Sequence, residues 1–198
     1  MATDIKKIIE NLLAIYDFGD RTIIVVGGGG GQFIEYGRSA GQILALDNDA
    51  EAIGRLRENL KTAGLEHKFT PILGDFYETR LKGDGVLFEF CLHEMSDPKA
   101  AVDHAKTMAS DIIIIDHWPG SEWSYYTAET EKVAASWAFL ESTSFRKIRR
   151  FDAVHFFVDY DELYQKVKAQ GDPSLARIGK FRSRRNISIP MSYGIVLI

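Results

Sequence analysis

The stretch Thr22-Ile-Ile-Val-Val-Gly-Gly-Gly-Gly-Gly31 joins an apolar run to five consecutive glycines. Glycine loses more conformational freedom on folding than any other residue, so this run indicates a backbone that turns tightly and lets a ligand approach closely. A second apolar run, Ile43-Leu-Ala-Leu-Asp47, follows after one helix-length stretch. This order is typical of a βαβ unit that binds a cofactor at its glycine turn. A flexible linker is the alternative interpretation, but a linker does not join a buried strand to a helix.

Apolar periodicity on either side of this unit predicts alternating strands and helices. The run Asp111-Ile-Ile-Ile-Ile115 is apolar on both faces and therefore belongs in the middle of a covered parallel sheet. We expect a doubly wound α/β fold: a mostly parallel seven-stranded sheet with helices on both faces and an antiparallel C-terminal strand. The predicted strands cover 22–26, 43–46, 68–73, 85–90, 111–115, 145–157 and 187–198; 145–157 is one long strand or a bent pair, and the last strand is interrupted near Pro190. The predicted helices cover 4–16, 32–40, 49–63, 98–108, 125–140 and 161–169.

The chain of 198 residues is expected to form one domain, with 45% hydrophobic and 26% charged residues. Within it we expect an N-terminal helix (1–17), a cofactor-binding core (18–118) and a C-terminal sheet extension on the acceptor side (119–198). A net charge of −4 gives no general attraction to nucleic acid or membranes, so neither is an expected partner. The single cysteine, Cys91, excludes an intramolecular disulfide framework and a cysteine-held iron–sulfur cluster. Without a leader or an apolar run of membrane-spanning length, cytoplasm is the expected location.

The letters around the glycines exclude two common cofactor motifs. A dinucleotide fingerprint requires a third glycine three positions after the second, but the three frames place Gln32, Phe33 or Ile34 there. A phosphate loop requires Gly-Lys before Ser or Thr, and the only Gly-Lys pair, Gly179-Lys180, precedes Phe181. The sequence therefore disfavours both a nicotinamide or flavin dinucleotide and a nucleoside triphosphate.

Four motifs remain, in the order Gly27-x-Gly29-x-Gly31, Asp47, Gly74-Asp75-Phe76, and Phe90-Cys-Leu-His-Glu-Met95. Together they resemble the class I S-adenosylmethionine-dependent methyltransferases of the small-molecule type, over roughly residues 17–118. The resemblance implies that the glycine turn approaches the methionyl and ribose part of S-adenosylmethionine. It also implies that Asp47 bonds the ribose hydroxyls and that Asp75 accepts from the adenine amino group. The implied cofactor-binding residues are Gly27, Gly29, Gly31, Asp47, Asn48, Asp75, Phe76 and Phe90.

One position departs from the family pattern. The family usually carries an acidic residue two positions before the first glycine, where this chain has Val25.

The methyl donor, S-adenosylmethionine, is a sulfonium cation with a carboxylate and an ammonium at one end. A helix N-terminus after the glycines is expected to hold that carboxylate, and an aromatic face to favour the cation.

Three polar side chains follow predicted strands whose ends face the site. His93, Glu94 and His117 are therefore the candidate catalytic residues, with a histidine as the proton acceptor for a weakly acidic acceptor group. A structural hydrogen bond that shapes the loop is the alternative role for His93. No His-Glu-x-x-His spacing or cysteine pair accompanies these residues, so no bound metal is expected.

The acceptor class is narrowed by what the sequence lacks. Enzymes of this superfamily that methylate base amino groups usually carry an Asn- or Asp-Pro-Pro-aromatic segment after the fourth strand, where this chain has Phe90-Cys-Leu-His93. A small-molecule methyl acceptor is therefore expected. One alternative is a catalytically silent protein that binds S-adenosylmethionine, and another is an RNA-directed methyltransferase that uses two basic groups, Arg146, Lys147, Arg149 and Arg150 with Lys180, Arg182, Arg184 and Arg185.

Overall fold

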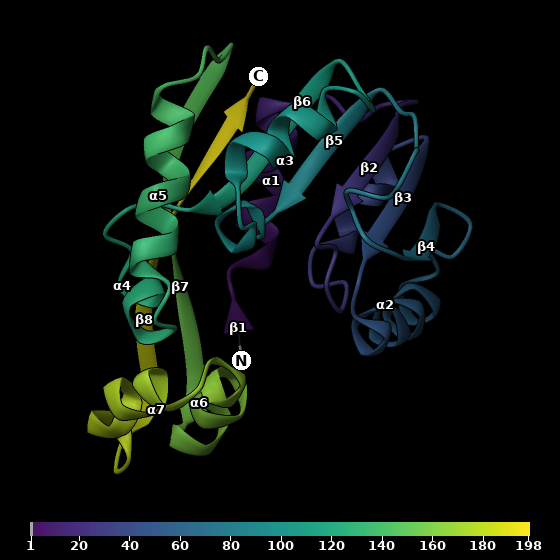
Figure 1. The fold of residues 1–198 in the computed structure, drawn as a ribbon. Helices are drawn as coiled ribbons and strands as arrows, with labels where there is room; N and C mark the ends of the chain where they lie inside the picture. Colours follow the sequence, from purple (N-terminus) through teal and green to yellow (C-terminus); the bar gives the residue numbers. More distant parts are fainter. Residues whose placement is uncertain (1) are drawn as a thin grey trace.

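A computed structural model describes residues 2–198, whose strands form one sheet in the order β1-β7-β8-β6-β5-β2-β3-β4 (Figure 1). The block β6-β5-β2-β3-β4 is parallel, and β8 runs antiparallel to both of its neighbours, β6 and β7. The predicted seven strands are confirmed, and the two-residue β1 adds to the edge of β7. The strands are β1 (Ala2–Thr3), β2 (Thr22–Val26), β3 (Gln42–Asp47), β4 (Phe69–Leu73), β5 (Gly85–Glu89), β6 (Asp111–His117), β7 (Lys147–Asp159) and β8 (Arg185–Leu197).

Helices cover both faces of the sheet, because alternate residues of each central strand enter two separate cores. Ile23 of β2 packs in one core with α1, α2, α4, α6 and α7, whereas Ile24 packs in the other with α3 and α5. The helices are α1 (Ile5–Ile15), α2 (Ala50–Ala63), α3 (Pro98–Ala105), α4 (Glu122–Tyr126), α5 (Thr130–Glu141), α6 (Tyr160–Val167) and α7 (Asp172–Ile178), with 3₁₀ turns at η1 (Ile34–Ser39), η2 (Leu92–Glu94), η3 (Lys168–Gln170) and η4 (Gly179–Phe181).

Local capping signals set the ends of the helices that flank the site. The Asp49 side chain accepts a hydrogen bond from the Glu51 amide at the start of α2, and Gly64 ends α2 in the left-handed conformation. Asp97 caps α3 in the same way, and Pro98 occupies its first turn. These helices follow the sequence prediction closely, so the loops between strands and helices are fixed at the carboxyl edge of the sheet.

The segment after the glycine turn differs from its prediction. Residues 32–40 do not form an α-helix; they contain the six-residue 3₁₀ turn η1. Gly37 lies inside this turn, and a Cβ there would collide with the ring of Phe69 on β4. Close packing of the Gly37 backbone on Phe69 therefore overrides the helix propensity of this segment. The predicted α-helix over 32–40 is therefore wrong, and the described segment after the glycines offers no α-helix N-terminus for the donor carboxylate.

The predicted helix over 125–140 is also two helices. Ala128 takes the left-handed conformation (φ +60°) between α4 and α5, which breaks the helix at that residue. The sequence prediction missed α7, and it was wrong to interrupt the last strand, because Pro190 of β8 pairs with Val154 of β7 in a continuous ladder. The break at Ala128 places Glu129 at the start of α5, next to the carboxyl edge of the sheet.

The β7–β8 hairpin extends beyond the rest of the sheet. β8 pairs with β7 from Arg185 to Leu197, but with β6 only from Tyr193 to Leu197. Figure 1 shows α6 and α7 at the far end of this hairpin. In the part of the chain that the structure describes, no helix is long and apolar enough to cross a bilayer.

Candidate active site

Two cavities lie at the carboxyl edge of the parallel strands, where ligands bind in open α/β sheets. The first cavity, of about 380 Å³, follows the glycine turn and is called here the cofactor cavity. Five of the eight predicted cofactor-binding residues line it, and the other three do not. The lining residues among the predicted set are Gly27, Asp47, Asn48, Asp75 and Phe76, joined by Cys91, Glu94, Met95 and Ser96.

The predicted glycines fit a backbone that other residues cannot follow. Gly27 has φ +70°, and a Cβ at this position would lie 2.6 Å from Cβ of Cys91. Gly29 and Gly31 also have positive φ, and the Gly29 amide donates to Oδ2 of Asp47 over 3.0 Å. Gly29 and Gly31 therefore shape the turn, whereas Gly27 forms part of the cavity wall.

The cofactor cavity presents the groups that a bound nucleoside needs. Asp47 accepts amide hydrogen bonds on both oxygens, from Gly29 and from Asp49 (2.9 Å), which fixes the carboxylate and leaves lone pairs for ligand hydroxyls. Asp75 accepts from the Tyr77 amide (2.7 Å), and the neighbouring Phe76 ring packs edge-on against His104. The residues present therefore fit a ribose and a base.

Val25 does not contribute to either cavity, because its side chain is buried in the core below the turn. A carboxyl group nevertheless lies nearby on the adjacent strand. Glu89 ends β5, is buried, and accepts a hydrogen bond from the Tyr36 hydroxyl over 2.7 Å. Burial is the main cause that raises the pKa of Glu89 to about 8; the charge of Asp47 adds to this effect, and the Tyr36 hydrogen bond opposes it.

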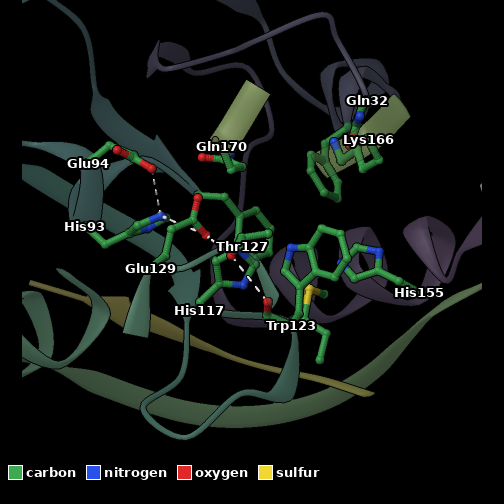
Figure 2. A pocket seen from close by; sticks show the side chains of 13 residues that line it. Gln32, His93, Glu94, His117, Trp123, Thr127, Glu129, His155, Lys166 and Gln170 are labelled. Carbon is green, nitrogen blue, oxygen red and sulfur yellow. Dashed lines mark hydrogen bonds and ion pairs between the residues drawn. The ribbon is translucent and has the colours of Figure 1, made fainter. Parts of the chain in front are cut away.

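The second cavity, of about 260 Å³, lies between the glycine turn and the β7–β8 hairpin and is called here the acceptor cavity (Figure 2). All three candidate catalytic residues line it. Phe90 lines this cavity rather than the cofactor cavity, with its ring stacked on Phe33 at 5.4 Å. The lining residues are Gln32, Phe33, Phe90, His93, Glu94, His117, Trp123, Thr127, Glu129, His155, Lys166, Gln170 and Met191.

His93 is held by a buried carboxylate that the sequence analysis did not single out. Nδ1 of His93 lies 2.5 Å from Oδ1 of Asp116, and the His93 amide donates to Oδ2 of the same carboxylate over 2.9 Å. Burial lowers the pKa of His93, but the hydrogen bonds with Asp116 and Glu94 outweigh burial and raise the pKa to about 10. The imidazole therefore carries a positive charge at neutral pH when these side chains are its only partners.

The opposite edge of the His93 ring, at Nε2, lies near two glutamates. Nε2 lies 3.5 Å from Oε1 of Glu94 and 3.8 Å from Oε2 of Glu129. Oε2 of Glu94 is paired with the Lys132 ammonium at 2.7 Å, while Glu129 accepts from the Thr127 hydroxyl over 2.5 Å. Burial raises the pKa of the Glu129 carboxyl.

His117 lies in the same cavity but differs in charge from His93. Burial lowers the pKa of His117 to about 4, so its ring is neutral at pH 7. Its Nδ1 is buried without a hydrogen-bond partner among the described residues, and its ring centroid lies 5.4 Å from that of His93. The cavity thus contains one charged and one neutral imidazole.

Several residues of the acceptor cavity were not predicted as site residues. A signal existed for Asp116, because it follows the apolar run of β6 directly at the edge that faces the site. His155 also lines the cavity and packs on Trp123 with ring centroids 4.3 Å apart. No sequence motif marks Glu129 and Lys166 as site residues, because only the placement of α5 and α6 brings them to the cavity.

The two basic groups do not come together. Lys147 pairs with Leu197 at one end of the β7–β8 hairpin, and Arg185 pairs with Asp159 at the other. Twelve residues of strand separate these ends by roughly 40 Å. The two groups therefore do not form one continuous patch.

Comparisons with known proteins agree with this architecture. A protein from Bacillus halodurans C-125, provisionally assigned as a methyltransferase, shares 12% identity with a TM-score of 0.67, covering 96% of each chain. An S-adenosylmethionine-dependent methyltransferase from Aquifex aeolicus shares 19% identity with a TM-score of 0.58, covering 98% of this chain and 97% of that one. The precorrin 8W decarboxylase of Methanobacterium thermoautotrophicum shares 14% identity with a TM-score of 0.63, covering 96% and 88%. At these identities the likeness shows the fold alone.

A family match goes further than the fold. No curated protein matches the sequence. The model of the RNA cap guanine-N2 methyltransferase family matches residues 20–134, a range that includes both the glycine turn and the candidate catalytic residues. This match and the shared fold support methyl transfer with S-adenosylmethionine as the cofactor. Because the matched range spans more than half of the chain, the protein belongs to the RNA cap guanine-N2 methyltransferase family.

Proposed function

We propose that the chain transfers a methyl group from S-adenosylmethionine to a small molecule bound in the acceptor cavity, by direct displacement. The observation that carries this proposal is that the two cavities meet at one side chain, because Glu94 lines both. A donor in the first cavity and an acceptor in the second are then neighbours, as an in-line displacement requires. Holding two reactants at near-attack distance can supply up to ~7–11 kcal/mol of the barrier reduction.

The side chains have distinct proposed roles. Asp47 binds the ribose hydroxyls, and Asp75 with Phe76 binds the base. S-adenosylmethionine supplies the methyl group as a sulfonium, for which little covalent chemistry is needed from the protein. His93, Glu94 and His117 are the proposed catalytic residues, because all three line the acceptor cavity.

An RNA acceptor is the second candidate, and the family name favours it. Two observations weigh against a base amino group in RNA as the acceptor. The segment after β5 is Phe90-Cys-Leu-His93 rather than the Pro-Pro-aromatic type, and the basic groups lie at opposite ends of the β7–β8 hairpin. The small-molecule acceptor is therefore the proposal, and RNA is an outcome of its test.

The cofactor is tested by calorimetric titration of the purified chain with S-adenosylmethionine, with its demethylated product and with NADH. We expect binding of the first two and none of NADH. The Asp47→Ala variant should lose this binding, while Asp103→Ala, which changes an exposed carboxylate on α3, should retain it. Absence of binding by the unsubstituted chain would reduce the proposal to an analogy of fold.

The acceptor is tested with S-adenosylmethionine labelled in its methyl group. The labelled donor and the chain are incubated with a cell extract that has been separated into a small-molecule fraction and an RNA fraction. Label in the small-molecule fraction supports the proposal, and label in RNA supports the second candidate. Cofactor binding with no label in either fraction identifies a catalytically silent protein.

A further inference from the structure

We propose that His93, Glu94 and Glu129 bind a divalent transition-metal cation in the wall of the acceptor cavity. One ligand atom from each of these side chains lies within 4.8 Å of the other two. Figure 2 shows the three side chains directed toward one another. His93 and Glu94 come from η2 after β5, and Glu129 follows the break at Ala128. The inference replaces the sequence-based expectation that no metal is bound.

The spacing of the three ligand atoms suits such a cation. Metal–ligand bonds of ~2.0–2.2 Å with tetrahedral angles place neighbouring ligand atoms ~3.4 Å apart. The two distances from Nε2 of His93, 3.5 Å to Glu94 and 3.8 Å to Glu129, are close to this value. The ligand atoms of Glu94 and Glu129 lie within 4.8 Å of each other, so closing the three groups around an ion moves these two carboxylates toward each other by at most ~1.4 Å.

The surrounding hydrogen bonds orient the ligand atoms as metal sites require. Asp116 occupies Nδ1 of His93, which leaves Nε2 to face the glutamates. A carboxylate on the far nitrogen of a histidine ligand is the usual outer partner at such sites. Lys132 occupies Oε2 of Glu94 and leaves Oε1 toward His93, while the Thr127 hydroxyl fixes the Glu129 carboxylate.

The polar groups of the cavity also call for a further ligand. The Glu129 carboxylate is buried, accepts from the Thr127 hydroxyl and lies 3.8 Å from Nε2 of His93; a metal ion bound between the two groups takes the place of the proton that His93 otherwise carries. Two carboxylates on one side of an imidazole attract a cation. In addition, Nδ1 of the buried His117 has no hydrogen-bond partner among the described residues, so the same cavity contains an unsatisfied polar atom.

The ligand set selects a class of metal. One imidazole and two carboxylates suit Zn²⁺, Mn²⁺, Fe²⁺ or Co²⁺, whereas Mg²⁺ and Ca²⁺ prefer oxygen ligands throughout. Three protein ligands leave a coordination position open, which is typical of catalytic rather than structural sites. The open position is available to a molecule in the acceptor cavity.

The role of the cation in catalysis rests on the proposed function. A hydroxyl oxygen of the acceptor, bound to the cation, releases its proton to solvent more readily. Its lone pair then forms the new carbon–oxygen bond to the donor methyl group. The carbon–sulfur bond breaks with its electron pair going to sulfur, so the sulfonium becomes a thioether. The expected acceptor is therefore a small molecule with a hydroxyl group that can bind a metal.

Metal binding is measured first, without donor or acceptor, by equilibrium dialysis of the untagged full-length chain against Zn²⁺, Mn²⁺ and Mg²⁺. We expect one transition-metal ion per chain and no comparable binding of Mg²⁺. The His93→Ala and Glu129→Gln variants should lose this binding, and Asp116→Asn should weaken it ~10–100-fold. Cobalt(II) should give the visible absorption of a protein-bound ion, and that signal should be absent from His93→Ala.

Matched controls separate loss of the site from loss of structure. Glu131→Gln makes the same change at an exposed position two residues from Glu129, and His67→Ala removes an exposed histidine. Both controls should bind the metal like the unsubstituted chain, and all variants should titrate with S-adenosylmethionine if they are folded. Absence of bound transition metal from the unsubstituted chain, or equal loss in variants and controls, overturns the inference.

The two proposals fail separately. Methyl transfer that continues undiminished after chelation, by a chain that binds no metal, overturns the metal site and leaves the proposed function intact. Stoichiometric metal binding without methyl transfer to any small molecule overturns the proposed function and leaves the metal site intact.

Discussion

Replacing Glu89 by glutamine should make the chain more stable in alkaline solution. Glu89 is buried at the end of β5, and its pKa is raised from 4.5 to about 8. The folded chain therefore keeps the carboxyl protonated over a pH range in which the unfolded chain ionises it. In this range the unfolded state binds fewer protons, so the free energy of unfolding falls as the pH rises.

The size of the effect follows from the two pKa values. Each unit of difference corresponds to ~1.4 kcal/mol, so the stabilising contribution present below pH 4.5 decreases by up to about 5 kcal/mol as the pH passes 8. Glutamine has no charge to lose and can still accept the hydrogen bond from Tyr36. At pH 8.5 the Glu89→Gln variant should therefore be more stable than the unsubstituted chain by a few kcal/mol, and at pH 5 nearly equal to it.

Urea unfolding at pH 5 and pH 8.5 measures the effect, with Glu66→Gln as the control at an exposed glutamate. The control should change the free energy of unfolding equally, and slightly, at both pH values. An equal difference between Glu89→Gln and the unsubstituted chain at the two pH values would falsify the assignment of a neutral carboxyl at this position.

Two further predictions concern the glycine turn and the base of the sheet. Gly27→Ala combines positive-φ strain with overlap on Cys91, so it should destabilise the chain by about 2–5 kcal/mol in thermal unfolding and abolish binding of S-adenosylmethionine. The control is Gly120→Ala, because Gly120 has φ +82° but no atom lies within 4 Å of the position that its Cβ would take. The control should cost only the strain of about 1–2 kcal/mol. Equal losses in the two variants would show that overlap with Cys91 is unimportant. Burial raises the pKa of Asp111, but the hydrogen bonds from Arg146 and Tyr16 outweigh burial, and the net effect lowers the pKa. The Asp111 carboxylate therefore stabilises the fold above its unfolded pKa, and this stabilisation is lost as the pH falls through the folded pKa. Asp111→Asn should therefore cost about 1 kcal/mol at pH 7, screened by solvent at the arginine, and have less effect at pH 3; a cost that does not shrink in acid would contradict this.

The sequence predicted the parallel half of the fold because its signals are local. Apolar runs bounded by turns define β2 to β6, and Asp49, Gly64 and Asp97 mark helix ends through caps that act within a few residues. The predicted positions at the strand ends, such as Asp47, His93 and His117, do meet at one edge of the sheet. A carboxyl-edge location follows from topology alone, so these residues could be found without a structure.

The differences arise where distant contacts override local preference. The residues on both sides of Ala128 favour one continuous helix, yet the backbone of Ala128 takes φ +60°. Distant contacts of α4 accompany this break: the Arg177 guanidinium donates to the Tyr125 carbonyl, and the Trp123 ring packs on His155. Glu129 reaches the acceptor cavity only because of it, so no periodicity in the sequence could have identified that residue.

The insertion of β8 between β6 and β7 has a consequence for how the chain is made. During synthesis β6 emerges well before β8, so the edge of the apolar segment Ile112–Ile115 stays open until the hairpin forms and docks. An open, apolar strand edge is a template for pairing with other chains. We therefore expect nascent or truncated forms that lack β8 to aggregate, even though the glycine turn and its parallel strands are already complete.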